Sequence, residues 1–304
     1  MTVSDTHNRI GIDLGGTKIE ALAMDRAGRE LFRQRVPTPV GDYAGTVRAV
    51  AALAQAAAAA AGDSASVGVG IPGSVSAATN LVKAANSVCL IGHPLERDLA
   101  DAIGKPVRLA NDADCFVLSE AADGAGADAD TVFGIILGTG VGGGLVVNKR
   151  VVRGANAITG EWGHTPLPWP ADDERPGPKC YCGLRGCLET FLCGSALAHD
   201  YAEQSGLSLS ATQIAEAAAR GDAAAVKVLD RYINRLARAT AILINIIDPY
   251  VIVLGGGVSN IPQLYEAVPL LWPDYILSDT VATRLVPPRH GDSSGVRGAA
   301  WLWP

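Results

Sequence analysis

Residues 9–24 read RIGIDLGGTKIEALAM, two runs of β-type residues on either side of a glycine turn. The runs are Arg9 to Leu14 and Lys18 to Met24, and a second turn at residues 25–28 leads into a third run from Leu31 to Val36. Apolar runs bounded by glycine and aspartate turns are typical of paired antiparallel strands. The segment therefore predicts a three-stranded meander at the start of the fold.

A similar pattern returns in the second half of the chain. An apolar run at residues 131–137 leads into Gly138-Thr139-Gly140, a second run covers Gly144 to Val147, and Val151-Val152 follows the next turn. After each meander, helix-like sequence precedes an apolar strand that ends in glycine. Glycine turns are common in any α/β protein, but their recurrence in the same order favours two related α/β halves that face each other across a ligand-binding cleft.

The second half is longer than the first. The interval from Asp13 to Gly70 is 57 residues, whereas that from Leu137 to Leu254 is 117, so the second half carries an insertion.

Helices are predicted in three places. One is the alanine-rich segment 43–61, and another is the C-terminal segment 296–303. The third covers residues 226–247, where apolar positions step by three or four and predict a core-facing stripe. The stripe consists of Val226, Leu229, Ile233, Leu236, Thr240, Leu243 and Ile247.

Composition excludes several classes of protein. The 304 residues are 48% hydrophobic and 18% charged with a mean hydropathy of +0.21, which is typical of a globular chain. The net charge of −6 and the pI near 5.4 provide no general positive field for nucleic acid or a membrane. The polar start MTVSDTHNR lacks the apolar segment of a secretory signal, so we expect a cytoplasmic protein.

The turn Asp13-Leu14-Gly15-Gly16-Thr17-Lys18 has the composition of a phosphate-binding site. Its two glycines let backbone N–H groups approach phosphate oxygens, and the Thr17 hydroxyl adds a donor. Asp13, at a strand end, can hold magnesium through water. A hairpin turn capped by Thr17 is the alternative, and Lys18 either contacts phosphate or points to solvent.

Two further glycine clusters have the same character. Residues 138–144 contain more glycine than a hairpin needs, which favours a second phosphate-binding wall. Gly255-Gly256-Gly257 follows a buried strand, where a base or ribose can lie against backbone that carries no side chain. Tight helix packing is the alternative explanation for this second cluster.

The apolar run at residues 107–110 ends in Asn111-Asp112. Either residue can cap the helix that follows. A carboxylate at the end of a strand can instead accept a hydroxyl proton, with the neighbouring amide fixing the same substrate. The spacing leaves both interpretations open.

A histidine and three cysteines form the strongest metal pattern. Gly160-Glu161-Trp162-Gly163-His164 precedes the run Cys180-Tyr181-Cys182-Gly183-Leu184-Arg185-Gly186-Cys187. Because the glycines permit tight turns around a tetrahedral ion, His164, Cys180, Cys182 and Cys187 predict structural zinc. A chance cluster or a redox pair is the alternative.

Other residues near this pattern are less specific. Glu189 follows the last cysteine by two positions, so a metal loop would place it rigidly, whereas an ordinary surface glutamate is the alternative. Cys89, Cys115 and Cys193 have no partners in sequence, and we expect them to be buried thiols.

Taken together, these motifs resemble the ROK family of sugar kinases over nearly the whole chain. The resemblance rests on Asp13-Leu14-Gly15-Gly16-Thr17, Asn111-Asp112, segment 160–164 and the Cys-x-Cys-Gly-x-x-Gly-Cys-x-Glu run at 180–189. It implies ATP-dependent phosphorylation of a hexose. It also implies a duplicated actin-like, hexokinase-like (ribonuclease H-like) α/β fold with two domains, an inter-domain cleft and a zinc-binding insertion.

The resemblance implies roles for individual residues. Asp112 is the catalytic base, and the zinc ligands are the four residues named above. Sugar hydroxyls are bound by Asn111, Glu161, His164 and Glu189, with Gly73, Ser74 and Asn86 as further contacts. The Mg-ATP phosphates are held by Asp13, Gly15, Gly16, Thr17, Lys18, Gly138, Thr139 and Gly140, and the adenosine by Gly255, Gly256 and Gly257. One ring nitrogen of His164 would bind zinc while the other faces the sugar.

Within the family, segments 160–164, 168–178 and 290–298 look like the bacterial fructokinase or manno(fructo)kinase branch. Fructose or mannose is therefore the expected substrate, and a glucokinase or N-acetylhexosamine kinase is the alternative. Phosphorylation at O6 is implied for an aldohexose. A non-catalytic sugar-sensing regulator and a filament-forming or chaperone ATPase are alternatives from other classes.

The expected organisation follows from the two halves. We predict an N-terminal α/β domain of residues 1–118 and 292–304, and a C-terminal domain of residues 119–291 that contains the zinc-binding segment 160–190. The resemblance also implies a homodimer, with no nucleic-acid or membrane partner.

Overall fold

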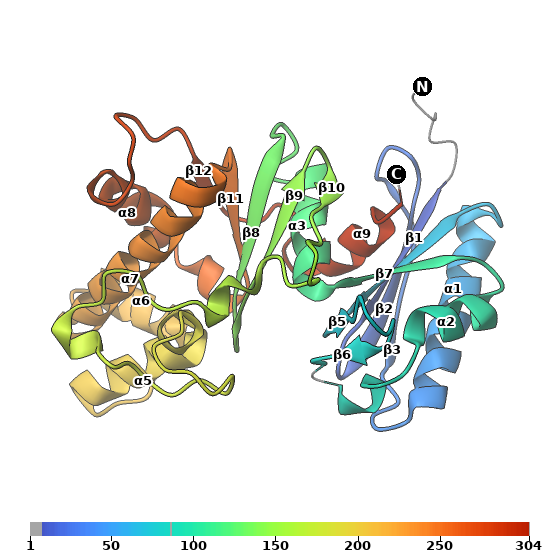
Figure 1. Ribbon diagram of the computed structural model, residues 1–304, viewed down its shortest axis with the longest axis horizontal. Coiled ribbons are helices and arrows are strands. Elements are labelled where there is room, and N and C mark those ends of the chain that lie inside the picture. Colours follow the sequence, from blue (N-terminus) through green and yellow to red (C-terminus); the bar gives the residue numbers. More distant parts are fainter. Residues whose placement is uncertain (1–7, 86, 304) are drawn as a thin grey trace. The chain divides into compact units, whose positions relative to one another are not determined.

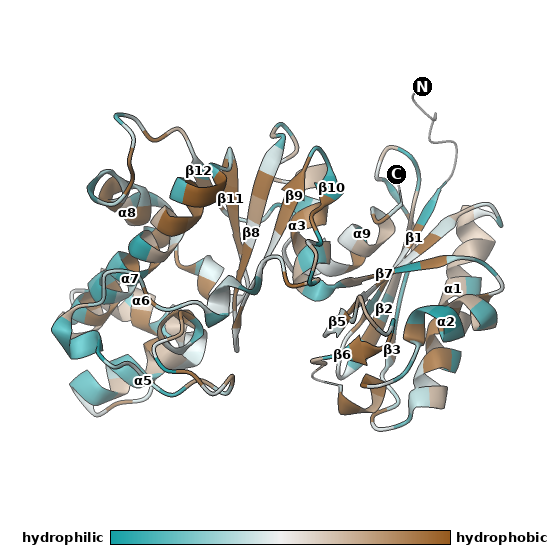
Figure 2. Ribbon diagram, in the orientation of Figure 1, coloured by the Kyte–Doolittle hydropathy of each residue, from teal (hydrophilic) through white to brown (hydrophobic). Residues whose placement is uncertain are grey.

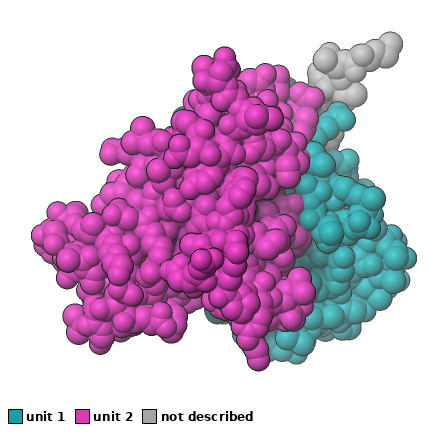
Figure 3. All heavy atoms as spheres, turned by 60° about the vertical axis from the view of Figure 1, so that its left-hand side comes forward, with its two compact units in different colours: residues 1–127, 149–159, 289–304 teal, residues 128–148, 160–288 magenta. Residues whose placement is uncertain are grey.

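A computed structural model describes residues 8–85 and 87–303 of the chain. Their contacts form two compact units, coloured separately in Figure 3. The first contains the described residues of 1–127, 149–159 and 289–304, and the second contains residues 128–148 and 160–288. A five-stranded mixed sheet forms the centre of each α/β fold.

The first sheet has the strand order β3-β2-β1-β4-β7 (Figure 1). The predicted meander is confirmed, since β1 (Arg9–Leu14), β2 (Lys18–Met24) and β3 (Glu30–Pro37) pair antiparallel. Two strands then join parallel to β1, namely β4 (Ser66–Ile71) and β7 (Val107–Asn111). A small separate sheet consists of β5 (Ser74–Val75) and β6 (Val82–Lys83).

Helices cover both faces of this sheet (Figure 1). One face carries α1 (Tyr43–Ala61) and α2 (Leu95–Ile103), and the other carries α3 (Asp112–Ala122) and α9 (Ser294–Ala300). A Cβ on Gly11 or Gly68 would lie 2.0 Å from a carbonyl oxygen of α9, so α9 packs directly on the strand backbones. This confirms the predicted C-terminal helix.

Helix α1 is long and apolar enough to cross a membrane by length and composition. Its buried residues, which include Val50, Leu53 and Ala57, belong to the core of the first unit. Such packing is typical of a core helix.

The second sheet has the equivalent order β10-β9-β8-β11-β12. Its strands are β8 (Thr131–Leu137), β9 (Val141–Val147), β10 (Arg150–Val151), β11 (Val251–Gly255) and β12 (Arg284–Val286). β8 pairs antiparallel with β9 and parallel with β11, just as β1 pairs with β2 and β4 in the first sheet. The predicted duplication is therefore present, and Figure 2 shows the apolar character of β8 and β11.

The helices of the second unit are α4 (Glu189–Leu192), α5 (Gly194–Ser205), α6 (Ala211–Ala219), α7 (Ala223–Ile247) and α8 (Gln263–Leu271). The predicted core stripe of α7 is correct from Leu229 to Leu243. It is wrong for Val226, which is 37% exposed, because the first turn of α7 turns Ala225 rather than Val226 to the core, and Ile247 is only partly buried.

The compact units divide the chain differently from the domain limits expected from the sequence, which stay a prediction. Residues 149–159 group with the first unit, where the Lys149 Nζ donates to the carbonyl oxygens of Ala121 and Ala127 at 2.6 and 2.5 Å.

Candidate active site and metal centre

Asn111 and Asp112 lie where β7 ends and α3 begins. Asn111 is the N-cap of α3, since its Oδ1 accepts a 2.8 Å hydrogen bond from the Ala113 N–H. Its Nδ2 donates to the carbonyl oxygen of Gly73 at 3.1 Å, which joins the end of β7 to the residues just beyond β4. Asn111 therefore caps α3, and its side-chain amide also holds it next to Gly73.

Asp112 is the first residue of α3 and is exposed. Its Oδ1 accepts a 2.8 Å hydrogen bond from the Ala113 N–H. The N-terminus of a helix favours the charged form of a carboxylate. An exposed carboxylate of this kind is chemically able to accept a proton from a hydroxyl group.

The turn Gly15-Gly16-Thr17 joins β1 to β2 as a hairpin. The Gly15 N–H donates to the Lys18 carbonyl at 3.0 Å, and a Cβ on Gly15 would lie 2.8 Å from that oxygen. Gly16, Thr17 and Lys18 are exposed. The turn is thus a hairpin whose outer backbone is accessible to a ligand, and the exposed Lys18 lies at its edge.

Asp13 lies beside this turn, near the end of β1. Burial, followed by the charges of Asp112 and Glu20, raises the pKa of Asp13 to about 6. The carboxylates of Asp13 and Asp112 therefore act on each other within the first unit. A cation such as Mg²⁺ near Asp13 would relieve this repulsion.

Glu20 is a buried charge that the sequence patterns did not identify. It lies opposite Asp13 in the β1–β2 register and forms ion pairs with Arg33 Nη1 at 3.0 Å and Arg35 Nε at 2.8 Å. A charged residue inside an apolar strand, with arginines in the next strand, is the pattern that could have revealed it. The two arginines compensate the Glu20 charge close to Asp13.

Replacement of Asp13 by Asn is expected to stabilise the metal-free protein at neutral pH. The folded-state pKa of about 6 exceeds the ordinary value of 3.8, so the native state binds this proton more tightly than the unfolded state. The stability that this group contributes is complete below pH 4 and is lost as the pH rises through 6. Asp13→Asn should therefore raise the free energy of unfolding by roughly 1 to 3 kcal/mol at pH 7.5, and by much less at pH 4.5.

Urea unfolding at the two pH values measures this effect. Asp25→Asn is the matched control, because hydrogen bonds from Arg29 and Ala27 lower the pKa of the partly buried Asp25 and no stabilisation at neutral pH is expected. Equal stability of wild type and Asp13→Asn at pH 7.5 would contradict the predicted repulsion.

In the second unit, the loop Gly138-Thr139-Gly140 connects β8 to β9. The Val141 N–H donates to Glu189 Oε2 at 3.1 Å, and a Cβ on Gly140 would lie 2.7 Å from the same oxygen. Glu189 Oε1 lies 4.0 Å from the Cys180 sulfur. Glu189 is thus not an ordinary surface residue, because it joins the glycine loop to the cysteine cluster.

In the Gly255-Gly256-Gly257 cluster, the structure explains the glycine at position 256. Gly256 has a φ of +79°, and a Cβ there would lie 2.4 Å from the Leu137 carbonyl oxygen, so close packing on β8 requires glycine. A Cβ on Gly257 would meet nothing within 4 Å. Packing against a strand, rather than a helix, therefore explains Gly256, while Gly257 is open.

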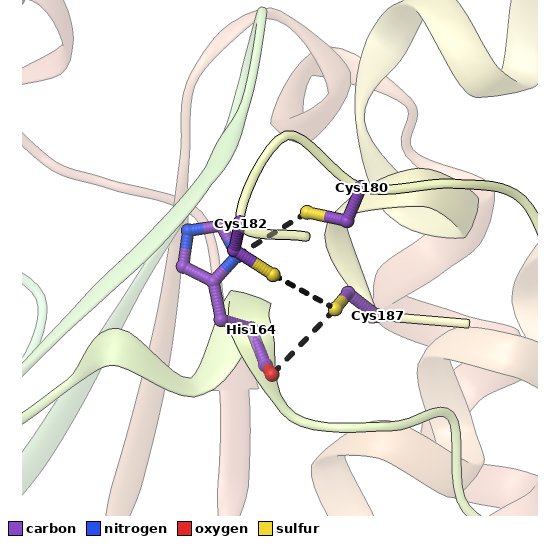
Figure 4. A group of neighbouring side chains, drawn as sticks. All are labelled: His164, Cys180, Cys182 and Cys187. Atoms are coloured by element: carbon purple, nitrogen blue, oxygen red, sulfur yellow. Dashed lines mark hydrogen bonds between the residues drawn. The ribbon is translucent and has the colours of Figure 1, made fainter. Parts of the chain in front are cut away.

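His164, Cys180, Cys182 and Cys187 form one cluster, shown in Figure 4. One ligand atom from each residue lies within 4.8 Å of all the others. His164 Nδ1 is 3.5 Å from the Cys180 sulfur, and the sulfurs of Cys182 and Cys187 are 3.7 Å apart. Gly183 and Gly186 have φ values of +95° and +72°, which permit the turns between the cysteines.

The chemistry of this cluster fits zinc. All six cysteines are free thiols, so Cys182 and Cys187 are not a disulfide pair. Burial and the neighbouring cysteines raise the pKa of the Cys187 thiol to about 12, so a metal ion must displace its proton. Three cysteines and one histidine at these distances match a closed tetrahedral site. Of the other three cysteines, Cys115 and Cys193 are buried as predicted, whereas Cys89 is only partly buried.

The 3-10 helix Glu161–His164 packs on β9 and places two candidate residues. A Cβ on Gly160 or Gly163 would lie 2.2 Å from a carbonyl oxygen of β9, and Trp162 Nε1 donates to the Gly142 carbonyl at 3.0 Å. The glycines therefore permit a close approach of backbones. Glu161 is exposed at the start of this turn, and His164 lies at its end.

The outward nitrogen of His164 has a protein partner that the sequence did not predict. His164 Nε2 lies 2.9 Å from the Tyr181 hydroxyl oxygen. The pKa of Tyr181 is raised by desolvation and then by the carboxylates of Glu189 and Glu161. These four residues of the second unit therefore form one polar group, in which Tyr181 contacts the nitrogen expected to face a sugar.

A buried ion-pair network fixes the segment between His164 and Cys180. Glu174 accepts hydrogen bonds from Arg235 at 2.7 Å and from Arg238 at 2.9 Å. Arg238 also donates to the carbonyl oxygens of Pro168 and Trp169 at 2.9 and 2.7 Å. Helix α7 therefore positions the loop that carries the metal ligands.

The predicted residues fall into two groups, one in each unit. Asp13, Gly73, Asn111 and Asp112 are associated in the first unit, and Glu161, His164 and Glu189 are associated in the second. Ser74 begins β5, paired with Lys83. Asn86 lies outside the described residues.

Comparisons with known proteins place the chain in a family. A profile described as the ROK family matches residues 9–304. An N-acetyl-D-glucosamine kinase of Yersinia pseudotuberculosis is 41% identical over 296 residues, which cover 96% of this chain and 97% of that protein.

Solved structures support the same placement. The ROK hexokinase of Thermus thermophilus has a TM-score of 0.85 and 33% identity, with 97% of each chain covered. A ROK family glucokinase of Streptomyces griseus, in complex with glucose and AMPPNP, has a TM-score of 0.74 and 29% identity, with 97% of this chain and 98% of that chain covered.

The similarity corrects the narrower expectation from the sequence. The relatives named here do not support the fructokinase or manno(fructo)kinase branch, and the alternative of an N-acetylhexosamine kinase agrees better with them. The motifs used for that branch include Gly160 to His164, which form the packing turn and a metal ligand and so do not discriminate between sugars. The matched profile, the duplicated fold and the metal cluster identify the chain as a member of the ROK family, a sugar kinase that uses ATP.

Proposed function

We propose that this protein phosphorylates N-acetyl-D-glucosamine with ATP, at the 6-hydroxyl group. Similarity of 41% over 96% of the chain to an N-acetyl-D-glucosamine kinase is the observation that carries the choice of sugar. The first and second units each contribute a set of polar residues suited to this reaction.

Asp112 is the proposed general base. Phosphoryl transfer requires little covalent chemistry from the protein, so positioning of the acceptor hydroxyl and stabilisation of charge are its main tasks. Asp112 accepts the proton of the 6-hydroxyl as the oxygen attacks the γ-phosphorus, and the bond between the γ-phosphorus and the β–γ bridging oxygen breaks to release ADP. Asn111, which the Gly73 carbonyl orients, binds a neighbouring sugar hydroxyl, with Gly73, Ser74 and Asn86 as further contacts.

The nucleotide is assigned to the glycine turns. Backbone N–H groups of residues 15–17 and 138–140 bind phosphate oxygens, with Lys18 at the edge of the first turn, and residues 255–257 line the adenosine. Asp13 would hold Mg²⁺, which neutralises phosphate charge when bound. The raised pKa of Asp13 supports this assignment, because a cation would stabilise the ionised form.

Glu161 and Glu189 are the proposed sugar-binding residues of the second unit, and the notional sugar contact of His164 passes through Tyr181, whose hydroxyl lies 2.9 Å from His164 Nε2. Zinc, held by His164, Cys180, Cys182 and Cys187, would supply structural support and no open coordination position. Glu189 is held by the Val141 N–H, so its carboxylate is oriented before the sugar arrives.

An ADP-release assay with a panel of sugars tests this proposal. N-acetylglucosamine should give a kcat/KM at least about tenfold above those of N-acetylmannosamine, glucose, mannose and fructose, because a site built for an acetamido group loses hydrogen bonds with other sugars. A preference for glucose or fructose would overturn the substrate but not the kinase class. Absence of turnover with every sugar, in folded zinc-loaded protein, would overturn the catalytic assignment.

A further inference from the structure

Tyr181 occupies an unusual position between two of the cysteines of the metal cluster. Its side chain is 83% exposed, so burial does not explain its orientation. The hydroxyl nevertheless lies 2.9 Å from His164 Nε2, and the two rings meet edge to face with centroids 5.0 Å apart and an interplanar angle of 90°. The contact with His164 therefore orients the exposed tyrosine.

The direction of the hydrogen bond follows from the metal cluster. His164 Nδ1 faces the sulfur of Cys180 and is the nitrogen available to a metal ion. A histidine bound through Nδ1 carries its proton on Nε2, so the Nε2–H donates to the Tyr181 oxygen. The O–H of Tyr181 then remains to be donated to another acceptor.

The polar residues around Tyr181 have no O–H or N–H group left to donate to a substrate. Glu161 and Glu189 lie near enough to act electrostatically on the Tyr181 hydroxyl, and ionised carboxylates accept hydrogen bonds but do not donate them. His164 already uses its Nε2–H on Tyr181. Within this group of four side chains, the Tyr181 hydroxyl is therefore the donor suited to an uncharged acceptor oxygen.

We propose that Tyr181 determines specificity: its contact with His164 Nε2 orients the hydroxyl, which donates its O–H to the acetamido carbonyl oxygen of the substrate. The inference rests on the proposed function. The sugar hydroxyls, which can donate, match the carboxylates of Glu161 and Glu189. The acetamido carbonyl, which can only accept, matches Tyr181.

Tyr181→Phe tests this proposal because it removes the hydroxyl and keeps the ring. The kcat/KM for N-acetylglucosamine should fall about tenfold, mainly through KM, while that for glucose stays within about twofold, because one hydrogen bond to the acetamido group is lost. Tyr250→Phe is the matched control, since Tyr250 is 63% exposed in the same unit and its backbone bonds to Thr131 and Arg284 rather than to the cluster. Its sugar selectivity should equal that of wild type.

Two further measurements separate this role from a structural one. Bound zinc should be unchanged in Tyr181→Phe. In protein labelled with ¹⁵N-histidine, which has only five histidines to assign, the Nε2–H signal of His164 should be protected from exchange in wild type and lose this protection in Tyr181→Phe.

Several outcomes would overturn the inference. Equal loss of activity toward both sugars in Tyr181→Phe would refute the contact with the acetamido group. Loss of zinc in this variant would show that the role of Tyr181 is structural. A lower KM in Tyr181→Phe would mean that the hydroxyl blocks the sugar. If wild type phosphorylates no sugar, the proposed function fails, and an unprotected Nε2–H signal in wild type would separately refute the contact with His164.

Discussion

Asp112→Asn is expected to lower kcat for sugar phosphorylation by roughly 1,000-fold, because the general base is lost while the shape of the residue is kept. Affinity for ATP should stay within about threefold, since the substitution leaves the glycine turns intact. The Ala113 N–H donates to both Asn111 Oδ1 and Asp112 Oδ1, and the Asn111 bond is kept in the variant, so α3 should keep its start. Steady-state kinetics and equilibrium binding of an ATP analogue measure the two effects.

Asp114→Asn is the matched control for Asp112→Asn. Asp114 lies in the same first turn of α3, so the control removes an equal charge from the same helix end. It should keep kcat within about threefold of wild type if proton acceptance, rather than helix electrostatics, is the role of Asp112. Equal losses in the two variants would refute Asp112 as the base, and so would a parallel loss of ATP affinity.

Cys187→Ser is expected to abolish stoichiometric zinc binding and to lower the melting temperature by about 5 °C or more, because metal binding contributes free energy only to the folded state. Cys187 is almost completely buried, and its sulfur lies 3.7 Å from that of Cys182, so a hydroxyl replaces a central ligand atom. Metal analysis and thermal unfolding measure the loss. Sugar affinity should also fall, since His164 loses its fixed orientation.

Cys193→Ser is the control for this second prediction. Cys193 is a buried thiol of the same unit, and its sulfur contacts the Ser195 hydroxyl rather than the cluster. This variant should retain zinc. Chelator treatment of wild type should reproduce the effect of Cys187→Ser, and a metal-free wild type of unchanged melting temperature would show that the cluster has no structural metal.

Sequence patterns predicted the parts of the fold that depend on short segments. The meander at Arg9 to Val36 is recognisable because strand alternation and its glycine turns occur within a few residues of each other. The helix at 43–61 has the bounds expected from its alanine content. The stripe of α7 was less exact at Val226, because the rotation of the helix about its axis, set by packing, turns Ala225 to the core in its place.

The metal cluster was also predictable, for a different reason. Cys180, Cys182 and Cys187 are close in sequence, and zinc coordination restricts ligand types and spacing strongly enough to include the distant His164. The choice of sugar was not predictable in this way. Segments such as 160–164 have structural tasks, packing on β9 and holding a metal ligand, that do not depend on the sugar.

The duplicated α/β architecture, the glycine turns and the His-Cys metal set can be predicted from the sequence, because periodicity, turn residues and ligand spacing act over short distances along the chain. Which charges and donors meet depends on how the elements pack in three dimensions. The ion pairs of Glu20 with Arg33 and Arg35 opposite Asp13, the Tyr181–His164 contact and the Glu174–Arg238 pair, 64 residues apart, all join residues from different parts of the fold. Such contacts depend on packing and register, which no local pattern specifies.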